Sequence, residues 1–456
     1  MAVSRTGRTP ALGRCYGVAI QNRTVHPRVV ARDGGSGMAV VTVSGGDGQA
    51  FTLTYAAPEL ARLAQTLADA VAAAARSTPV SSVVYDGPSP DGRGVPAAPA
   101  GTLGQVVVRT AGNRLALPAD RTVLMVQGGG PNTVQGGGGM EQRVLADDGR
   151  LTLDTGGGSG TVLAGDGGNR VSVPGGSFLV QTGAGDDTVG LGGGRSTVAA
   201  GAGRNLVGST GPATAVVLSA GQDTVAGYAG AGRAGADTVS VLGGGTLVLG
   251  GGSDITFIGG AGPSTVIGAS GGVTVRGGAG GGVFHGGRAG NNRLTGEAGA
   301  VTLFGGGAGD VLSAASAGSN VLVAGAGNET LLGGDAMGPS LFVAGFAEPQ
   351  RGLDAATTVQ GGPAGDTIQA GTGSLTADGR GGADLYVFQH GSAGGAATLR
   401  FDPAADRVQL RGYAAGEADR ALSAATRGAG GLTVTLSDNT RITFLDLASL
   451  DRGVFG

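Results

Sequence analysis

The sequence predicts a mainly β fold: a parallel β-solenoid (β-roll) of nonapeptide repeats with a small N-terminal αβ module and a C-terminal β cap. The first observation behind this prediction is that valine recurs every nine residues through the middle of the chain. The second is composition, because 99 of the 456 residues are glycine, 4 % are aromatic and none is tryptophan, as is typical of repetitive architectures. The third is a hydrophobic content of 40 %, which is higher than a disordered glycine-rich chain has.

Residues 1–77 are expected to form the small αβ module. Apolar and polar residues alternate over 16–55, for example in MAVVTVSGGDGQAFTLTY at 38–55, which predicts a β-hairpin that turns at residues 45–48. Residues 58–77 begin with proline and glutamate and predict an amphipathic helix. Its apolar face is expected to contain Leu60, Leu63, Leu67, Val71 and Ala74. A Pro- and Gly-rich segment, 78–104, is expected to be a linker.

Residues 105–387 are expected to form the solenoid. Valine occupies eight consecutive nine-residue frames, at Val162, Val171, Val180, Val189, Val198, Val207, Val216 and Val225. After a five-residue insertion the ladder resumes at Val239 and continues, with other aliphatic and aromatic residues, to Tyr386. One apolar residue beside a glycine-rich half suits a short strand and a tight turn, because glycine adopts positive φ. With about 18 residues and about 4.8 Å per turn, the rod would be about 70 Å long.

Composition and charge exclude several classes of function. Charged residues make up 14 % of the chain and the formal net charge is −3, so no nucleic-acid partner is predicted. All 30 basic residues are arginine, which excludes the lysines of P-loop and Schiff-base chemistry. No apolar run is long enough to predict a membrane-spanning segment. The single cysteine, Cys15, cannot form an internal disulfide.

No catalytic site is predicted. The sequence contains no HExxH motif, and its three histidines are far apart: His26, His285 and His390. GASGG at 268–272 formally matches GxSxG around Ser270, but it lies inside a repeat rather than at a strand-to-helix turn. The adjacent Asp147 and Asp148 lie in a repeat turn and are expected to be solvated.

Three stretches place an aspartate at position 6 of the nonapeptide, two residues before the periodic apolar residue at position 8. They are TGAGDDTVG at 182–190, GGPAGDTIQ at 361–369 and GRGGADLYV at 379–387. These stretches resemble the GGxGxDxUx unit of RTX (repeats-in-toxin) proteins, the haemolysin-type calcium-binding repeats. The resemblance implies a β-roll in which aspartate side chains and turn carbonyls hold calcium between stacked turns. Other residue types take position 6 in most turns, so the repeats are degenerate.

The C-terminal region carries a second resemblance, over residues 384–456. GGADLYVFQHG, TLRFDPAADRVQLRGY and GGLTVTLSDNTRITFLDLASL are similar in order and spacing to the end of exported RTX proteins. In that family the region caps the β-roll and contains an uncleaved signal for type I secretion. The resemblance implies that residues 388–456 are a cap and secretion region, that type I secretion machinery is a partner, and that the protein is secreted or lies at the cell surface. An N-terminus without the apolar core of a signal peptide is consistent with this route.

Candidate calcium ligands are acids and amides that stand 18 residues apart, because the ligands of one site must share one edge of the stacked turns. They are Asn169, Asp187 with its neighbour Asp186, Asn205 and Asp223 in one column, Asn292 and Asp310 in another, and Asp366 and Asp384 in a third. Calcium takes about six to eight oxygens, several from carboxylates, so these mixed columns predict few and weak sites. The alternative is a polar ladder in which Asn and Asp bond to the backbone.

The expected function is that of a non-enzymatic structural, adhesive or surface-layer component, which binds a cell surface or assembles with itself. An alternative is an ice- or polysaccharide-binding solenoid, because threonine recurs at position 7. These threonines are Thr161, Thr188, Thr197, Thr224, Thr238, Thr256, Thr265 and Thr274. Leu179, Leu206 and Ala215 interrupt the series. A hydrolase with an unrecognised active site in the N-terminal module is a third, weaker alternative.

Overall fold

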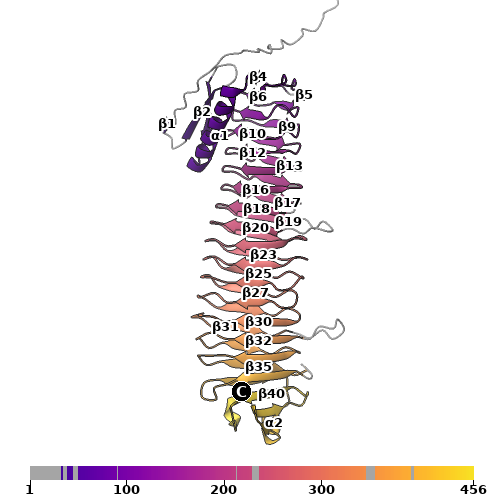
Figure 1. Cartoon of the computed structure of the whole chain (residues 1–456). Coiled ribbons are helices and arrows are strands. Elements are labelled where there is room, and N and C mark those ends of the chain that lie inside the picture. Colours follow the sequence, from indigo (N-terminus) through magenta and orange to yellow (C-terminus); the bar gives the residue numbers. More distant parts are fainter. Residues whose placement is uncertain are drawn as a thin grey trace, which may run out of the picture.

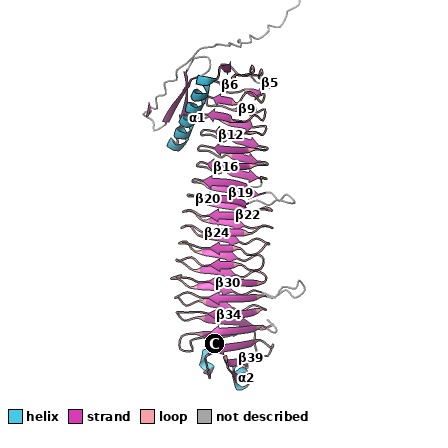
Figure 2. Cartoon of the chain, in the orientation of Figure 1, coloured by secondary structure: helices cyan, strands magenta, loops and turns pink. Residues whose placement is uncertain are grey.

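The computed structural model describes residues 32–33, 39–44, 50–89, 91–211, 213–227, 236–345, 355–391 and 395–456. Within these residues the chain is a long rod, a parallel β-solenoid of about 15 turns, as the sequence predicts (Figure 1). A small αβ module lies beside the first turns, and a cap closes the other end. The described helices lie at these two ends, and strands fill the rod between them (Figure 2).

Two parallel sheets form the two faces of the rod. Sheet 1 contains the even-numbered strands β4 (Val80–Tyr85), β6 (Leu103–Val108), β8 (Val123–Val126), β10 (Gln142–Ala146), β12 (Ser159–Leu163), β14 (Ser177–Gln181), β16 (Arg195–Ala200), β18 (Ala213–Leu218), β20 (Ala236–Val241), β22 (Asp254–Ile258), β24 (Val273–Arg276), β26 (Arg293–Thr295), β28 (Val311–Ser313), β30 (Asn328–Leu332), β32 (Ala356–Gln360), β34 (Ser374–Asp378) and β36 (Ala396–Arg400). Sheet 2 contains the odd-numbered strands β5 (Arg93–Gly94), β7 (Arg114–Ala116), β9 (Asn132–Gln135), β11 (Leu151–Asp154), β13 (Arg170–Val173), β15 (Thr188–Leu191), β17 (Leu206–Ser209), β19 (Gln222–Gly227), β21 (Gly245–Leu249), β23 (Ser264–Ile267), β25 (Gly282–His285), β27 (Val301–Phe304), β29 (Asn320–Val323), β31 (Ser340–Val343), β33 (Thr367–Gln369), β35 (Leu385–Gln389) and β37 (Arg407–Arg411). Because the chain alternates between the sheets, two strands make one turn.

The periodic valines stack on one another inside the rod. In sheet 1, Val180 lies opposite Val198 on the next turn, and in sheet 2, Val171 lies opposite Val189. Val189 and Val198 are 1 % and 0 % exposed. The prediction that position 8 faces a single continuous core is confirmed.

Aromatic residues take over position 8 in the later turns. Phe257, Phe284, Phe342 and Tyr386 are fully buried. The ring centroids of Phe257 and Phe284 are 5.9 Å apart. Such rings bury more apolar area than valine, so they contribute a large share of the core in this half of the rod.

Close stacking of the turns requires glycine at one corner. Gly158, Gly176 and Gly194 have φ values of +86°, +88° and +96°, which other residues rarely adopt. A Cβ on Gly176 would overlap the carbonyl oxygen of Gly158 on the preceding turn, and a Cβ on Gly194 would overlap that of Gly176. Glycine is therefore needed here both for its backbone conformation and for its lack of a side chain.

The N-terminal module packs on the outer face of sheet 1. It consists of β1 (Arg32–Asp33), β2 (Ala39–Ser44), β3 (Ala50–Tyr55) and α1 (Pro58–Ser77). Strands β2 and β3 are antiparallel, as predicted, whereas the expected turn at 45–48 lies outside the described residues. The fully buried face of α1 contains Leu60, Ala61, Ala64, Ala68 and Val71. It contacts outward-facing apolar residues of the first turns, among them Val107, Met125, Leu145 and Leu163.

The solenoid is longer at both ends than the sequence indicates. Residues 78–104 are not a linker, because β4 pairs in parallel with β6 and forms the start of sheet 1. The Pro- and Gly-rich stretch lies after β4, where the chain turns towards β5. At the other end the two sheets continue past residue 387 through β36 and β37.

The cap covers the last turn of the rod. It consists of α2 (Glu417–Ser423), β38 (Thr426–Gly428), β39 (Gly431–Thr435), β40 (Arg441–Leu445) and a 3-10 helix at Arg452–Val454. Strand β40 pairs in parallel with β36, and β39 returns antiparallel to β40, which ends the parallel ladder. Phe401, Phe444 and Phe455 are buried and their rings contact in series.

Replacing Phe257 by alanine is expected to destabilise the rod by about 3–5 kcal/mol, because the lost ring leaves a cavity that the stacked turns cannot close. The neighbouring Ile258→Ala is the matched control, since Ile258 faces outward and is 40 % exposed. Urea denaturation followed by circular dichroism measures both. Equal losses for the two variants would contradict the inward packing of position 8.

Candidate functional site

The candidate ligands at position 6 point into the rod rather than towards solvent. Alternate residues of a strand share one face, so position 6 faces the same side as position 8. Asn169, Asp187, Asn205 and Asp223 are accordingly only 1–2 % exposed. Asn169, Asp187 and Asn205 lie directly before β13, β15 and β17, and Asp223 is the second residue of β19, so all four line the interior at the start of these sheet 2 strands.

A chain of hydrogen bonds joins these four side chains along the rod. The Oδ1 atom of Asp187 accepts from the backbone N–H of Asn169 at 2.7 Å, one turn earlier. Asn205 Oδ1 accepts from Asp187 N at 3.1 Å, and Asp223 Oδ1 accepts from Asn205 N at 2.9 Å. The structure thus brings all four together in one column, in which each side chain satisfies the backbone of the preceding turn.

Asparagine and aspartate differ in the hydrogen bonds that their second side-chain atom, Nδ2 or Oδ2, makes. Asn169 Nδ2 donates to the carbonyl oxygens of Gly165 and Gly167, both at 2.8 Å. The side chain of Asn169 therefore has its hydrogen bonds satisfied without a ligand. The Oδ2 atoms of Asp187 and Asp223 are buried and have no hydrogen-bond partner among the described residues. An unpaired buried carboxylate oxygen is unfavourable, and a bound cation would relieve it.

The column of Asn292 and Asp310 is satisfied by the protein itself. Asp310 Oδ1 accepts from both the backbone N–H and the Nδ2 of Asn292, each at 2.8 Å. Its Oδ2 accepts from Gly306 N at 2.6 Å. Because turn N–H groups face this carboxylate, the site offers no position for a cation beside Oδ2.

Asp366 repeats this arrangement at the far end of the rod. Its Oδ1 accepts from Ser340 N and its Oδ2 from Gly362 N, both at 2.7 Å. Asp384 Oδ1 accepts from Asp366 N at 2.8 Å, so these two predicted residues also stack. Asp186 differs from all the others, because its side chain is 61 % exposed and lies 3.8 Å from the Arg204 guanidinium.

Several other buried amide and acid residues occupy position 6, but the sequence search missed them because they are not spaced by 18 residues. They are Asn113, Asn132, Asn320, Glu329 and Asp406, all buried. Insertions lengthen their turns, so Asn132 lies 19 residues beyond the amide it accepts from and Asp406 lies 22 beyond. Each stands two residues before a buried apolar residue, as Glu329 does before Leu331, and this local signal could have identified them.

Burial raises the pKa values of five acids that point into the rod. It raises the pKa of Asp187 to about 6 and that of Asp384 to about 6. Burial, with a smaller contribution from Asp310, raises the pKa of Glu329 to about 7. Both carboxylate oxygens of Glu329 lack hydrogen-bond partners among the described residues. The pKa values of Asp223 and Asp366 are also raised by burial. The interior columns therefore hold carboxylates that favour protonation.

Asp147 and Asp148 are not solvated, contrary to the sequence-based expectation. Asp147 is 8 % exposed and its Oδ2 accepts from Gly128 N at 3.1 Å. Thr54 of the N-terminal module donates to Asp148 Oδ2 at 3.4 Å. Burial, together with these two carboxylates, raises the pKa of Tyr55 at the end of β3. The pair belongs to the junction between module and rod.

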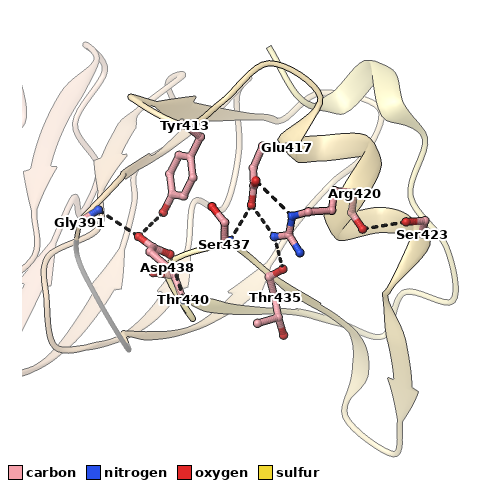
Figure 3. Close-up of polar contacts among 9 residues, drawn as sticks. All are labelled: Gly391, Tyr413, Glu417, Arg420, Ser423, Thr435, Ser437, Asp438 and Thr440. Carbon is pink, nitrogen blue, oxygen red and sulfur yellow. Dashed lines mark hydrogen bonds and ion pairs between the residues drawn. The ribbon is translucent and has the colours of Figure 1, made fainter.

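A second polar network lies in the cap, between α2 and the hairpin β39–β40 (Figure 3). Glu417 accepts from the Arg420 guanidinium and, at 2.7 Å, from Ser437 N. Tyr413 donates to Asp438 Oδ2 at 2.8 Å. The ion pair with Arg420 lowers the pKa of Glu417. Since the acids in this network are paired, it stabilises the cap and offers no free acid or base.

The threonines of the alternative function are divided between the two faces. Thr161, Thr197, Thr238, Thr256 and Thr274 lie on sheet 1, and Thr188, Thr224 and Thr265 lie on sheet 2. A further column, Thr330, Thr358, Thr376 and Thr398, is in register on sheet 1 near the cap. It is bordered by the Asp378–Arg400 ion pair, so it is a single column and not a flat threonine array.

Among the described residues, no group of three or more His, Cys, Asp or Glu side chains lies in an arrangement that could hold a metal ion. None of the described helices is long and apolar enough to cross a membrane. Comparisons with protein-family models, with curated proteins and with solved structures give no match to this chain.

In calcium-free buffer the rod is expected to lose stability as the pH rises from about 4.5 to about 7.5. Unfolded carboxylates have a pKa of about 4, whereas the folded values for Asp187 and Glu329 are about 6 and about 7. The folded state therefore holds these protons more tightly, and its advantage disappears as the pH passes through the folded values. Melting temperatures measured across this range test the sign.

Glu329→Gln is expected to flatten the upper part of this pH profile, because glutamine does not ionise. The exposed Glu141→Gln, whose side chain is 79 % exposed, is the matched control and should leave the profile unchanged. A melting temperature that rises steadily with pH in the wild-type protein would contradict the raised pKa values of the buried acids.

Proposed function

We propose that this chain is a non-enzymatic extracellular rod, a structural or adhesive component with a few weak calcium sites. The observation that supports this function best is the uninterrupted pair of parallel sheets over about 15 turns. At about 4.8 Å per turn the rod is about 70 Å long. A filled, continuous core makes such a rod stiff, so that it holds the N-terminal module and the cap at a fixed separation.

Ser270, His285 and His390, the residues of types used in catalysis, contact neighbouring residues of the rod and the cap. Ser270 Oγ donates to the Gly251 carbonyl at 3.4 Å. His285 stacks on Phe304 with ring centroids 4.4 Å apart, and His390 contacts Tyr413 edge-on at 5.0 Å. These contacts support a non-enzymatic role, because the serine and both histidines lie in separate turns and bond to structural neighbours.

Calcium fits best where aspartate replaces asparagine in the first column. In the Asp187 turn, the glycines equivalent to Gly165 and Gly167 are Gly183 and Gly185, one 18-residue turn later. Their carbonyl oxygens and Asp187 Oδ2 would hold the ion, with a similar set at Asp223. Because calcium takes about six to eight oxygens, so few protein ligands favour weak binding, near the 10⁻⁴ to 10⁻³ M of extracellular modules.

The proposed extracellular location and export rest on the resemblance of residues 384–456 to the end of exported RTX proteins. In the structure this region forms the last strands of the rod and its cap. Because β40 of the cap pairs with β36, the cap and the last turn would emerge together at the start of export from the C-terminus, and the earlier turns could then stack on them.

Asp187→Asn is expected to abolish the calcium response of its turn and to stabilise the calcium-free rod by about 1 kcal/mol, because the new amide would donate to turn carbonyls as Asn169 does. In wild-type protein, millimolar calcium should add roughly 0.5–1.5 kcal/mol per site. Thermal melts in chelator and in calcium measure both effects. Asp186→Asn, the same exchange on an exposed neighbour, is the control, and an undiminished calcium shift in Asp187→Asn would contradict the site.

A passenger protein fused to residues 388–456 is expected to leave cells that contain a type I exporter. The fusion is needed because deleting residues from about 400 onward also removes β40, which covers β36, so the deletion alone could act through misfolding. A passenger fused to residues 105–180 of the rod is the control. Retention of the first fusion inside the cell would contradict export through this region.

A further inference from the structure

The outer face of sheet 2 carries an apolar strip in the middle of the rod. Two adjacent columns of outward-facing residues run from β21 to β31 in parallel register. The first column is Leu247, Thr265, Val283, Thr302, Val321 and Leu341, and the second is Leu249, Ile267, His285, Phe304, Val323 and Val343. We call these twelve residues the sheet 2 strip.

The strip is exposed and uncharged. Ile267, Leu249 and Val283 are 42 %, 37 % and 36 % exposed, which is unusual for adjacent large apolar side chains. Its one titratable residue, His285, stacks on Phe304, and burial lowers its pKa, which keeps it neutral near pH 7. No aspartate, glutamate or arginine belongs to the outward columns of sheet 2 from β15 to β33.

Sheet 1 differs over the same turns. Its outer face carries the Arg276–Glu297 ion pair and, nearer the cap, the Arg400–Asp378 pair. Where sheet 1 is apolar on the outside, at Leu145 and Leu163, helix α1 and the β2–β3 hairpin cover it. Among the described strands, the apolar outer columns of the first turns of sheet 1 are covered by described residues, whereas those of the sheet 2 strip are not.

We propose that the sheet 2 strip is the interface between two copies of this chain, which pack sheet 2 against sheet 2 as a two-fold dimer. The interface extends beyond the strip over the uncharged outer face of sheet 2 from β15 to β33. These ten strands span about 48 Å at about 4.8 Å each, and a width of about 15 Å gives roughly 700 Å² per copy. The pair would bury about 1,400 Å² in total, within the range of stable interfaces.

A second copy is the occupant that fits this surface best. A flat parallel sheet is complementary to another flat sheet, and two such sheets pack about 10 Å apart. A two-fold interface uses the same patch on both subunits, so an uncharged patch meets no like charges when it contacts itself. The dimer is independent of calcium and of export, and it goes beyond the proposed function by assigning a role to one face of the rod.

Sedimentation velocity of the full chain, in chelator and at micromolar concentration, tests the proposal. The wild-type protein is expected to sediment as a dimer. Ile267→Glu, near the middle of the outer face from β15 to β33, should raise the dimer Kd by about a hundredfold or more, since each dimer would bury two unpaired carboxylates. Ile258→Glu is the matched control, because it makes the same exchange on sheet 1 of the same turn at 40 % exposure, and the dimer should persist.

Cross-linking provides a readout that does not depend on a destabilising charge. In a Cys15→Ser background, Val283→Cys should cross-link to its counterpart through a short bis-maleimide, whereas Thr274→Cys on sheet 1 of the same turn should not. Circular dichroism verifies that each variant is folded. A monomeric wild-type protein, dissociation by both glutamate variants, or equal cross-linking of both cysteine variants would overturn the proposal.

Discussion

The parallel register between successive turns is the constraint on which the rest of this structure depends. Each residue lies about one strand spacing, 4.8 Å, from its counterpart one turn away, so every position forms a column of like environments. An apolar column makes the core, as at Val171 and Val189. A column of amide and carboxylate side chains closes one corner, and a column at Gly158, Gly176 and Gly194 closes another. A residue that does not suit its column disturbs two neighbours at once.

The residue at position 6 of the interior polar columns determines whether a turn is stable by itself or gains from a bound cation. Asparagine at position 6 supplies both an acceptor for the preceding turn and a donor for its own turn, as Asn169 does. Aspartate keeps the acceptor, but its second oxygen must find an N–H group, as in Asp310, or remain without one, as in Asp187. The balance between amides and acids along a column thus decides how far the rod is stable by itself and how far it benefits from a cation.

The sequence predicts the core of this fold well, because a nine-residue period is a direct consequence of the stacking. It also predicts which ligands stack at the regular turns, such as Asp187 beneath Asn205. It fails where the period changes: Glu329 and Asp406 follow insertions, and β4 precedes a Pro- and Gly-rich stretch that conceals its pairing with β6. The sequence period does not determine what covers an outward residue such as Leu145, which packs against the N-terminal module. Nor does it determine the second contact of Asp366, whose Oδ2 accepts from Gly362 N.

The insertion after β19 shows that the register tolerates added length at a corner. Val225 of β19 lies opposite Val248 of β21, although the chain between them is five residues longer than in the regular turns. A loop can therefore vary in length and composition without a change in the adjoining strands. For evolution this separates two rates of change. The strands and the corners built on glycine, asparagine or aspartate must conserve their columns, whereas a corner that carries an insertion can diversify. For engineering it makes such corners places to graft foreign peptides, displayed at defined heights along a stiff scaffold.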